Sequence, residues 1–192
     1  MAAALLVGFD VLAQGTYNLD NSPISTGGIV DAKVFDFYGT TPLTGPTSFA
    51  QLFIGTVSNN ASLTPQGAIV SFYPAGSGGE GYVKPSGTTI TATIVAPGTS
   101  GFVQLRAWSG AATYAAAFAT PGAKTGFSSI LNLIAGGSGA PPSLPANLVG
   151  LHSFSMQGPL TPPIMPEPSA ITLGILGGAA LLLKSILSRR FC

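Results

Sequence analysis

Glycine and proline occur so often in this chain that they limit the kinds of element it can form. The 192 residues include 26 glycines and 16 prolines, which divide the chain into short segments. Glycine adds backbone freedom that a helix must remove, and proline lacks the N–H that a helix interior needs. We therefore expect no long helix through most of the chain, and short elements joined by turns instead.

The segments between these breaks are rich in β-branched and aromatic residues and have the length of strands. Residues 88–95, for example, alternate between outward threonines and inward Ile90, Ala92 and Ile94. The expected strands are 29–38, 49–57, 68–73, 88–95, 102–108, 114–118 and 148–156. One further segment, 126–133, is a short and ambiguous candidate helix. The predicted fold class is all-β, an antiparallel β-sandwich of about 7–9 short strands, because many short strands joined by turns are typical of it.

The segment 102–108 has two faces of different character. One face is aliphatic and the other is aromatic and polar: Val103, Leu105 and Ala107 against Phe102, Gln104, Arg106 and Trp108. Arg106 is expected to pair with Asp31 or Asp36 on a neighbouring strand. Trp108 has two interpretations. It either stacks on a sugar ring, as aromatic residues of carbohydrate-binding modules do, or fills a core position of the sandwich.

Charge is scarce in this sequence, at 7% of residues against about 25% in ordinary soluble domains. Between residues 14 and 165, four basic and four acidic side chains cancel to a formal charge of zero. Nucleic-acid binding requires basic patches, so we expect no nucleic-acid partner. The only cysteine, Cys192, is the last residue, which excludes a disulfide or a thiol nucleophile in the body of the chain.

The residue set for catalysis is also sparse. His152 is the only histidine, so a serine hydrolase would have to use it, and no Gly-x-Ser-x-Gly motif is present. A glycosidase needs two carboxylates at one cleft, but Asp31 and Asp36 differ by an odd number and face opposite sides of a regular strand. Glu80 lies in a glycine-rich loop. We predict no catalytic residue, no metal site and no cofactor, and we interpret His152 as an ordinary strand residue.

The C-terminal segment has the composition of a membrane helix. Lys184 is the only charged residue in 170–187, and Arg189 and Arg190 follow. Eighteen helical residues span roughly 27 Å, close to the hydrocarbon thickness of about 30 Å. We expect a single C-terminal transmembrane helix. Lys184, Arg189 and Arg190 form its basic stop and place the C-terminus in the cytoplasm.

The run Met165-Pro166-Glu167-Pro168-Ser169, followed by the apolar segment and the basic end, resembles the PEP-CTERM sorting signal of Gram-negative bacteria. The resemblance implies that Pro166, Glu167 and Pro168 form the sorting motif. It also implies an exosortase as the partner that removes the tail during export. Ala96-Pro97-Gly98-Thr99, the run 103–108, the proline-rich run 141–145 and Leu148-Val149-Gly150-Leu151 resemble an uncharacterised family of short exported PEP-CTERM proteins, numerous in Verrucomicrobia.

The N-terminal residues resemble the end of a signal peptide. Residues 1–7 are apolar, and Val11 and Ala13 are small residues at the −3 and −1 positions of a signal-peptidase site, with cleavage after Ala13. A basic n-region is missing before the apolar run, so we expect that residues 1–13 are a partial signal peptide whose start lies upstream.

These observations predict four regions: a partial signal peptide (1–13), a β-sandwich domain (14–158), a proline-rich linker with the sorting motif (159–169) and the tail helix (170–192). The expected function is that of an exported, non-enzymatic structural protein of the cell surface or extracellular matrix. The alternatives are a module that binds exopolysaccharide, a hydrolase built on His152, and a self-assembling surface-layer or fibre subunit.

Overall fold

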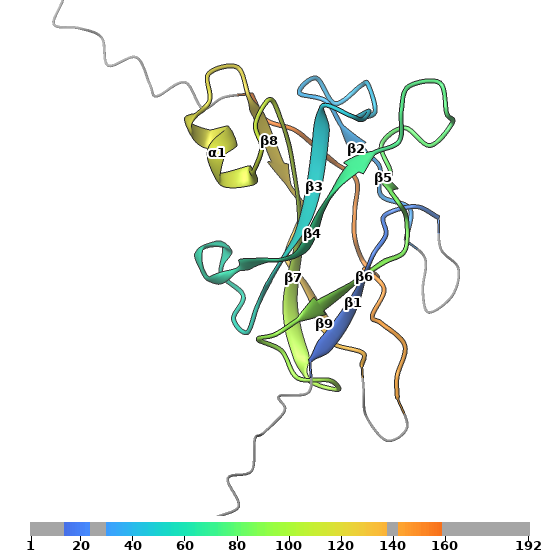
Figure 1. The fold of residues 1–192 in the computed structure, drawn as a ribbon, viewed down its shortest axis with the longest axis vertical. Helices are drawn as coiled ribbons and strands as arrows, with labels where there is room; N and C mark the ends of the chain where they lie inside the picture. The colour runs from blue at the N-terminus through green and yellow to red at the C-terminus, as the bar shows by residue number, and fades with distance from the viewer. Residues whose placement is uncertain (1–13, 24–29, 138–141, 159–192) are drawn as a thin grey trace, which may run out of the picture. The chain divides into compact units, whose positions relative to one another are not determined.

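The computed structural model describes residues 14–23, 30–137 and 142–158, and most of its regular structure is strand (Figure 1). The strands are β1 (Gly15–Leu19), β2 (Val34–Phe35), β3 (Ser48–Gly55), β4 (Thr64–Phe72), β5 (Val83–Lys84), β6 (Thr88–Ala92), β7 (Ser100–Ser109), β8 (Lys124–Phe127), β9 (Leu131–Ile134) and β10 (Phe154–Ser155). A 3₁₀ turn, η1 (Asn60–Ser62), and one α-helix, α1 (Tyr114–Ala119), accompany them. The all-β expectation is therefore confirmed for the described residues.

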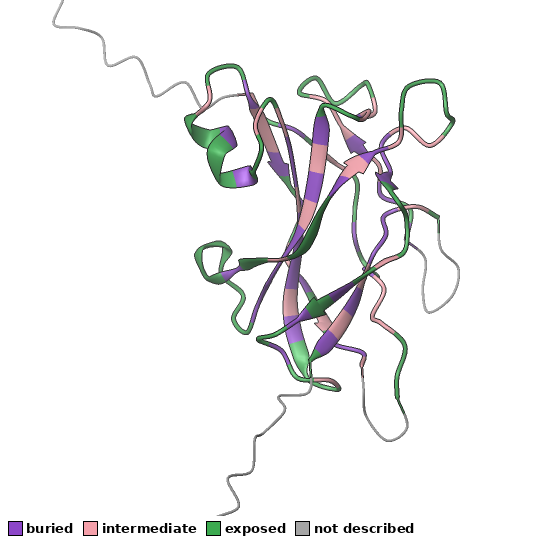
Figure 2. Ribbon diagram, viewed as in Figure 1, coloured by how far each residue is buried: buried purple, intermediate pink, exposed green. Residues whose placement is uncertain are grey.

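One six-stranded antiparallel sheet is the main structural layer. Its order is β5-β4-β3-β7-β8, and β9 pairs with the other half of β7. β7 is long enough to hold both partners: β9 pairs with residues 100–103 and β8 with residues 106–109. Along its other edge β7 pairs with the whole of β3. β7 is therefore the central strand, and Figure 2 shows it and β3 buried over much of their lengths.

The inward face of this sheet packs on the main hydrophobic core. Alternate residues of β3 and β7 enter it, and among them Leu52, Ile54, Val103 and Leu105 are at most 1% exposed. β1 and β6, which pair antiparallel, contribute residues to the same core, as does β2. β2 and β10 pair in parallel, an arrangement that the antiparallel prediction missed. The predicted aliphatic face of 102–108 is thus confirmed as the core face.

The outer face of the sheet carries a second, smaller core. α1 supplies Tyr114 and Ala117, which pack with Phe53 of β3 and Trp108 of β7. The rings of Trp108 and Tyr114 meet edge to face, with centroids 6.1 Å apart. A sheet face covered by a helix is buried on both sides at that point, which explains why β7 shows so little exposed surface.

Several predicted elements are wrong. Segment 114–118 is the helix α1, because its three consecutive alanines favour a helix and the Thr113 side chain caps it by accepting from the Ala116 N–H at 3.1 Å. Segment 126–133 is no helix: it holds the end of β8 and most of β9. In 29–38 and 148–156 only β2 and β10 are strands, and loops fill the rest.

The two ends of the chain lie outside the described residues. Ala13, the sorting motif Pro166-Glu167-Pro168, and the basic residues Lys184, Arg189 and Arg190 are among them. In the described part, no helix has the length and apolar character needed to cross a membrane.

Candidate functional site

An irregularity in the sheet shapes its outer face between β4 and α1. The β3–β4 register is regular up to Ala50, which pairs with Val70, and resumes where Leu52 pairs with Gln66. The extra β4 residues bulge out opposite Gln51, whose side-chain amide donates to the Gly67 carbonyl at 2.8 Å. Gly67 has φ +69°, a conformation that favours glycine. Bulges of this kind redirect side chains, and here Ile69 is 40% exposed on the outer surface.

A groove of about 650 Å³ lies beside the bulge, and we call it the outer-face groove. Gln51 and Phe53 of β3 and Arg106 of β7 line it from the sheet, and Pro65 and Ile69 line it from β4. Figure 1 shows α1 and the turn that holds η1 on the same side of β3 and β7. The groove is therefore built from strands and a helix that the two cores hold in place.

The opposite wall of the outer-face groove is the first turn and a half of α1. It consists of Thr113, Tyr114, Ala115 and Phe118. Tyr114 is buried and contacts Phe118 edge to face, with ring centroids 5.2 Å apart. Phe118 itself is 60% exposed, so one aromatic ring of this wall is available to a ligand.

Among the described residues, Arg106 is the only charged one that lines the outer-face groove. Its guanidinium carbon lies 4.1 Å from the ring centroid of Phe53 and 5.2 Å from that of Tyr114, which are cation–π distances. Its Nε donates to Gln104 Oε1 at 2.7 Å, and its Nη2 donates to the Asn60 carbonyl at 2.8 Å. An arginine has five N–H donors, so several remain for a ligand.

A buried glutamine orients this arginine. Gln104 is 1% exposed, and its Nε2 donates to the Asn60 side-chain oxygen at 2.9 Å and to the Ser128 carbonyl at 2.8 Å. These two bonds identify the amide nitrogen and leave the Oε1 atom facing Arg106. The guanidinium is therefore held by stacking on one side and by two hydrogen bonds at its edge.

Burial lowers the pKa of Arg106 from its usual value, and the neighbouring Tyr114 opposes that effect. Arginine starts from so high a pKa that it stays charged in proteins. Burial also raises the pKa of Tyr114, so its ring remains neutral at physiological pH. The outer-face groove thus presents one fixed positive charge within an otherwise uncharged wall.

The predicted pairing of Arg106 with Asp31 or Asp36 is wrong. Asp31 accepts from the Tyr82 hydroxyl at 2.6 Å, and Asp36 accepts from backbone N–H groups of its own turn, including that of Tyr38 at 3.2 Å. Across the described residues no ion pair involving Arg106 is recorded. The guanidinium is compensated by ring faces and neutral oxygens.

The predicted ligand-stacking role of Trp108 is also wrong. Trp108 is 0% exposed, and its indole N–H donates to the Ala111 carbonyl at 3.0 Å. The core interpretation of this residue is the one that the structure bears out. An exposed aromatic residue that does line the outer-face groove is Phe118, ten residues further along the chain, in a segment predicted to be a strand.

His152 and the acidic residues do not converge. His152 is exposed in the loop before β10, and within the described ranges no side chain is recorded as hydrogen-bonded to it. Asp20 accepts from Ser22, and Glu80 accepts from the N–H of Gly78 in its own turn. The described ranges contain no group of three or more His, Cys, Asp or Glu side chains placed to hold a metal.

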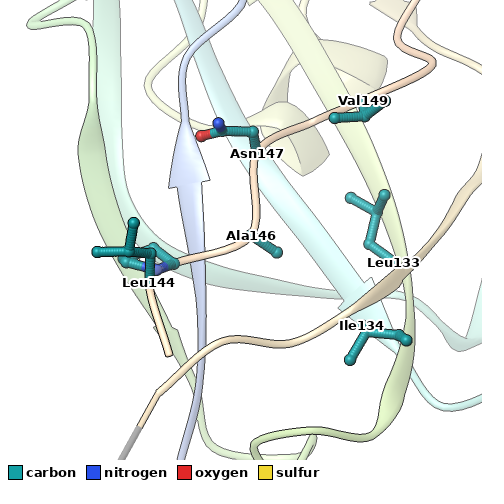
Figure 3. A pocket seen from close by; sticks show the side chains of 7 residues that line it. Leu133, Ile134, Leu144, Ala146, Asn147 and Val149 are labelled. Carbon is teal, nitrogen blue, oxygen red and sulfur yellow. The ribbon is translucent and has the colours of Figure 1, made fainter. Parts of the chain in front are cut away.

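A second groove, of about 310 Å³, lies beside β9. Figure 3 shows Leu133 and Ile134 of β9 across an open space from Ala146 and Asn147, whose amide points toward β1. That amide oxygen accepts from Asn18 of β1 at 3.0 Å. No charged side chain of the described ranges lines this groove.

Comparisons with protein-family models, curated proteins and solved structures found no match to this chain. The site is therefore argued from its own geometry. Sequence reasoning placed Arg106 on the correct face of its strand but missed its partners. Phe53, Ile69 and Phe118 carried no signal as site residues, because a β-bulge and a helix predicted as a strand bring them together.

Proposed function

We propose that this chain is an exported, non-enzymatic structural protein of the cell surface or extracellular matrix, delivered through its C-terminal signal. The observation that carries the proposal is the order of three features: Pro166-Glu167-Pro168, the apolar segment 170–187, and the basic stop at Lys184, Arg189 and Arg190. In this proposal the segment 170–187 holds the chain in the membrane until an exosortase removes it. The low charge content agrees with a surface solubilised by uncharged polar side chains.

Expression of the full chain in hosts with and without an exosortase tests the export proposal. The expected result is a shortened, surface-located product only in the exosortase-positive host. Glu167→Ala should prevent this processing, whereas Glu80→Ala, a change of the same kind in an exposed loop, should not. Unchanged processing and localisation of Glu167→Ala would overturn the proposal.

We also propose that the described residues form a β-sandwich. The six-stranded sheet supplies one layer, and β1 with β6 and β2 with β10 supply the other. The support is the shared core, in which Tyr17 and Ile90 from the small sheets are buried in the same cluster as Leu52 and Leu105 from the large sheet. Two layers of strands that share one core are the defining feature of that architecture.

The outer-face groove favours a second candidate function, the binding of exopolysaccharide. It combines an exposed aromatic ring, Phe118, with a few polar groups from Gln51, Thr113 and Arg106, and such mixed lining is common in ligand sites. A glycan array probed with the full chain tests this candidate. Binding that Phe118→Ala weakens and Phe37→Ala, at an exposed position that does not line the groove, leaves unchanged would support it. If the chain binds none of the glycans on the array, this candidate function is rejected.

A further inference from the structure

Arg106 is a pre-positioned cation with spare hydrogen-bonding capacity. Its recorded protein partners use Nε and one Nη2 N–H, and in the described part of the chain no carboxylate pairs with it. Its planar group is fixed by the Phe53 ring and by Gln104, so a ligand would pay little entropy to use it. A partly buried positive charge without a counter-charge is the strongest unexplained feature of the outer-face groove.

The number of charges indicates which anion suits this position. Arginine binds carboxylate through two parallel N–H···O bonds, and a carboxylate carries one negative charge. Phosphate groups carry more charge at neutral pH and are usually held by several cations or by a row of backbone N–H groups. In the part of the chain that the structure describes, Arg106 is the only cation lining the groove, so it matches a single carboxylate.

The rest of the groove indicates what carries the carboxylate. Phe118 and Ile69 are 60% and 40% exposed, so they offer apolar surface to one side of a ligand. The polar residues Gln51 and Thr113 also line the groove. A long aliphatic acid needs an enclosed cavity for its tail, whereas a sugar ring places one apolar face on an aromatic ring and keeps its hydroxyls in water.

We propose that the outer-face groove binds a uronic acid residue of an acidic exopolysaccharide, with the carboxylate on Arg106 and the sugar ring against Phe118. Gln51 and Thr113 contact the ring hydroxyls. This inference rests on the exopolysaccharide-binding candidate above and adds the charge of the ligand and the residue that selects it. It is independent of how the chain is exported.

Calorimetric titration of the full chain in detergent micelles tests the proposal. The probes are a short oligogalacturonate, its methyl ester, a neutral malto-oligosaccharide and benzoate. The oligogalacturonate should bind, and its methyl ester, which removes only the charge, should bind roughly tenfold more weakly. Raising the salt concentration should weaken the binding of the acid and leave that of the ester unchanged.

Variants separate recognition from folding. Arg106→Gln should abolish the preference for the acid over the ester, and Arg106→Lys should restore only part of it because a lysine lacks the planar fork. Phe118→Ala should weaken the binding of both sugars about equally. Lys124→Gln and Phe37→Ala, which change a cation of β8 and an exposed phenylalanine that does not line the groove, should bind as the original chain does. Urea unfolding of each variant identifies any that fail to fold. If Arg106→Gln does not fold, Phe118→Ala still tests the proposal, because position 118 is exposed and the substitution should leave the fold intact.

Each outcome supports or overturns a defined part of the proposal. Equal affinity for the acid and its ester would overturn the role of Arg106 while leaving exopolysaccharide binding intact. Binding of benzoate without binding of any sugar would overturn both the uronic acid and the exopolysaccharide candidate, and would make the groove a site for small carboxylates. Binding of the acid that is unchanged in Arg106→Gln and Phe118→Ala would place recognition elsewhere in the chain.

Discussion

Tyr17 is buried in the main core with a hydroxyl that has no hydrogen-bond partner among the described residues. The hydroxyl lies close to Gly101 of β7, where a Cβ atom would collide with the Tyr17 oxygen and crowd the Val95 side chain. An unpaired buried hydroxyl costs roughly 1–3 kcal/mol relative to its hydrated state. Glycine at 101 is thus required by a close approach of side chains, since its own φ is ordinary.

We expect Tyr17→Phe to raise the free energy of unfolding by about 1 kcal/mol, because it removes an unsatisfied polar atom and keeps the ring. Gly101→Ala should lower it by roughly 1–3 kcal/mol through overpacking. In the double variant that cost should shrink, since the colliding oxygen is gone. Urea unfolding monitored by the fluorescence of Trp108, the only tryptophan, measures all three. Strictly additive effects would contradict the proposed contact.

Stability should also fall at high pH because of Tyr17. Burial raises the pKa of this hydroxyl from 10.0 to about 12. Between those values the unfolded chain releases the proton while the folded chain retains it, so the free energy of unfolding decreases as pH rises. The contribution of Tyr17 to this loss should reach about 2–3 kcal/mol near pH 12, so the decline should be smaller by that amount in Tyr17→Phe. The decline that remains belongs to groups such as Tyr82 and Tyr114, whose pKa burial also raises. Tyr38→Phe, at a 77% exposed position, is the control and should leave the decline unchanged.

Single residues also show where sequence reasoning succeeds. The alternation of 102–108 correctly separated Val103 and Leu105 from Arg106 and Trp108, because the period of a strand is fixed by its geometry. It could not tell that α1 covers the second face. That cover decides the environments of both residues. Arg106 lies over the rings of Phe53 and Tyr114 at the edge of a groove, and Trp108 is fully enclosed.

The same limit applies to the elements. Segments with a strong β-branched pattern became β3, β4, β6 and β7, whereas 114–118 became a helix. Tyrosine and phenylalanine at its ends suggested a strand, but three alanines and a cap from Thr113 favour the helix, and its aromatic ends lie four residues apart on one side. The β3–β4 bulge left no signal in the sequence that we could interpret beforehand.

The cap on α1 should be measurable. Thr113→Ala removes the side chain that accepts from the Ala116 N–H and should destabilise the protein by about 1 kcal/mol. Thr113→Ser keeps the hydroxyl and should lose only a few tenths of that amount. Thr120→Ala, which removes a hydroxyl bonded to the Ala116 carbonyl at the other end, is a matched control with a smaller expected effect. Equal destabilisation by Thr113→Ser and Thr113→Ala would exclude capping as the cause.

Over the described chain as a unit, stability rests on packing and neutral hydrogen bonds. Asn21 illustrates this: it is 0% exposed, and its side chain bonds to the carbonyls of Ala32 and Gly81 and to the Val83 N–H. One neutral amide thereby joins three chain segments. Sequence reasoning had no means of identifying Asn21 as the residue that connects them, because its partners come from segments 11 to 62 residues away.

The weak role of charge leads to a prediction about salt. No ion pair is recorded within the described ranges, so the free energy of unfolding should change by less than about 0.5 kcal/mol between low and high ionic strength. Binding of an acidic sugar at Arg106 should weaken over the same range, since that contact depends on a charge. Urea unfolding and calorimetric titration in the same buffers measure the two quantities. A free energy of unfolding that depends on salt would contradict the first expectation and would mean that ion pairs contribute to stability. Binding that does not depend on salt would contradict the second, because Arg106 would then not contact the ligand through its charge.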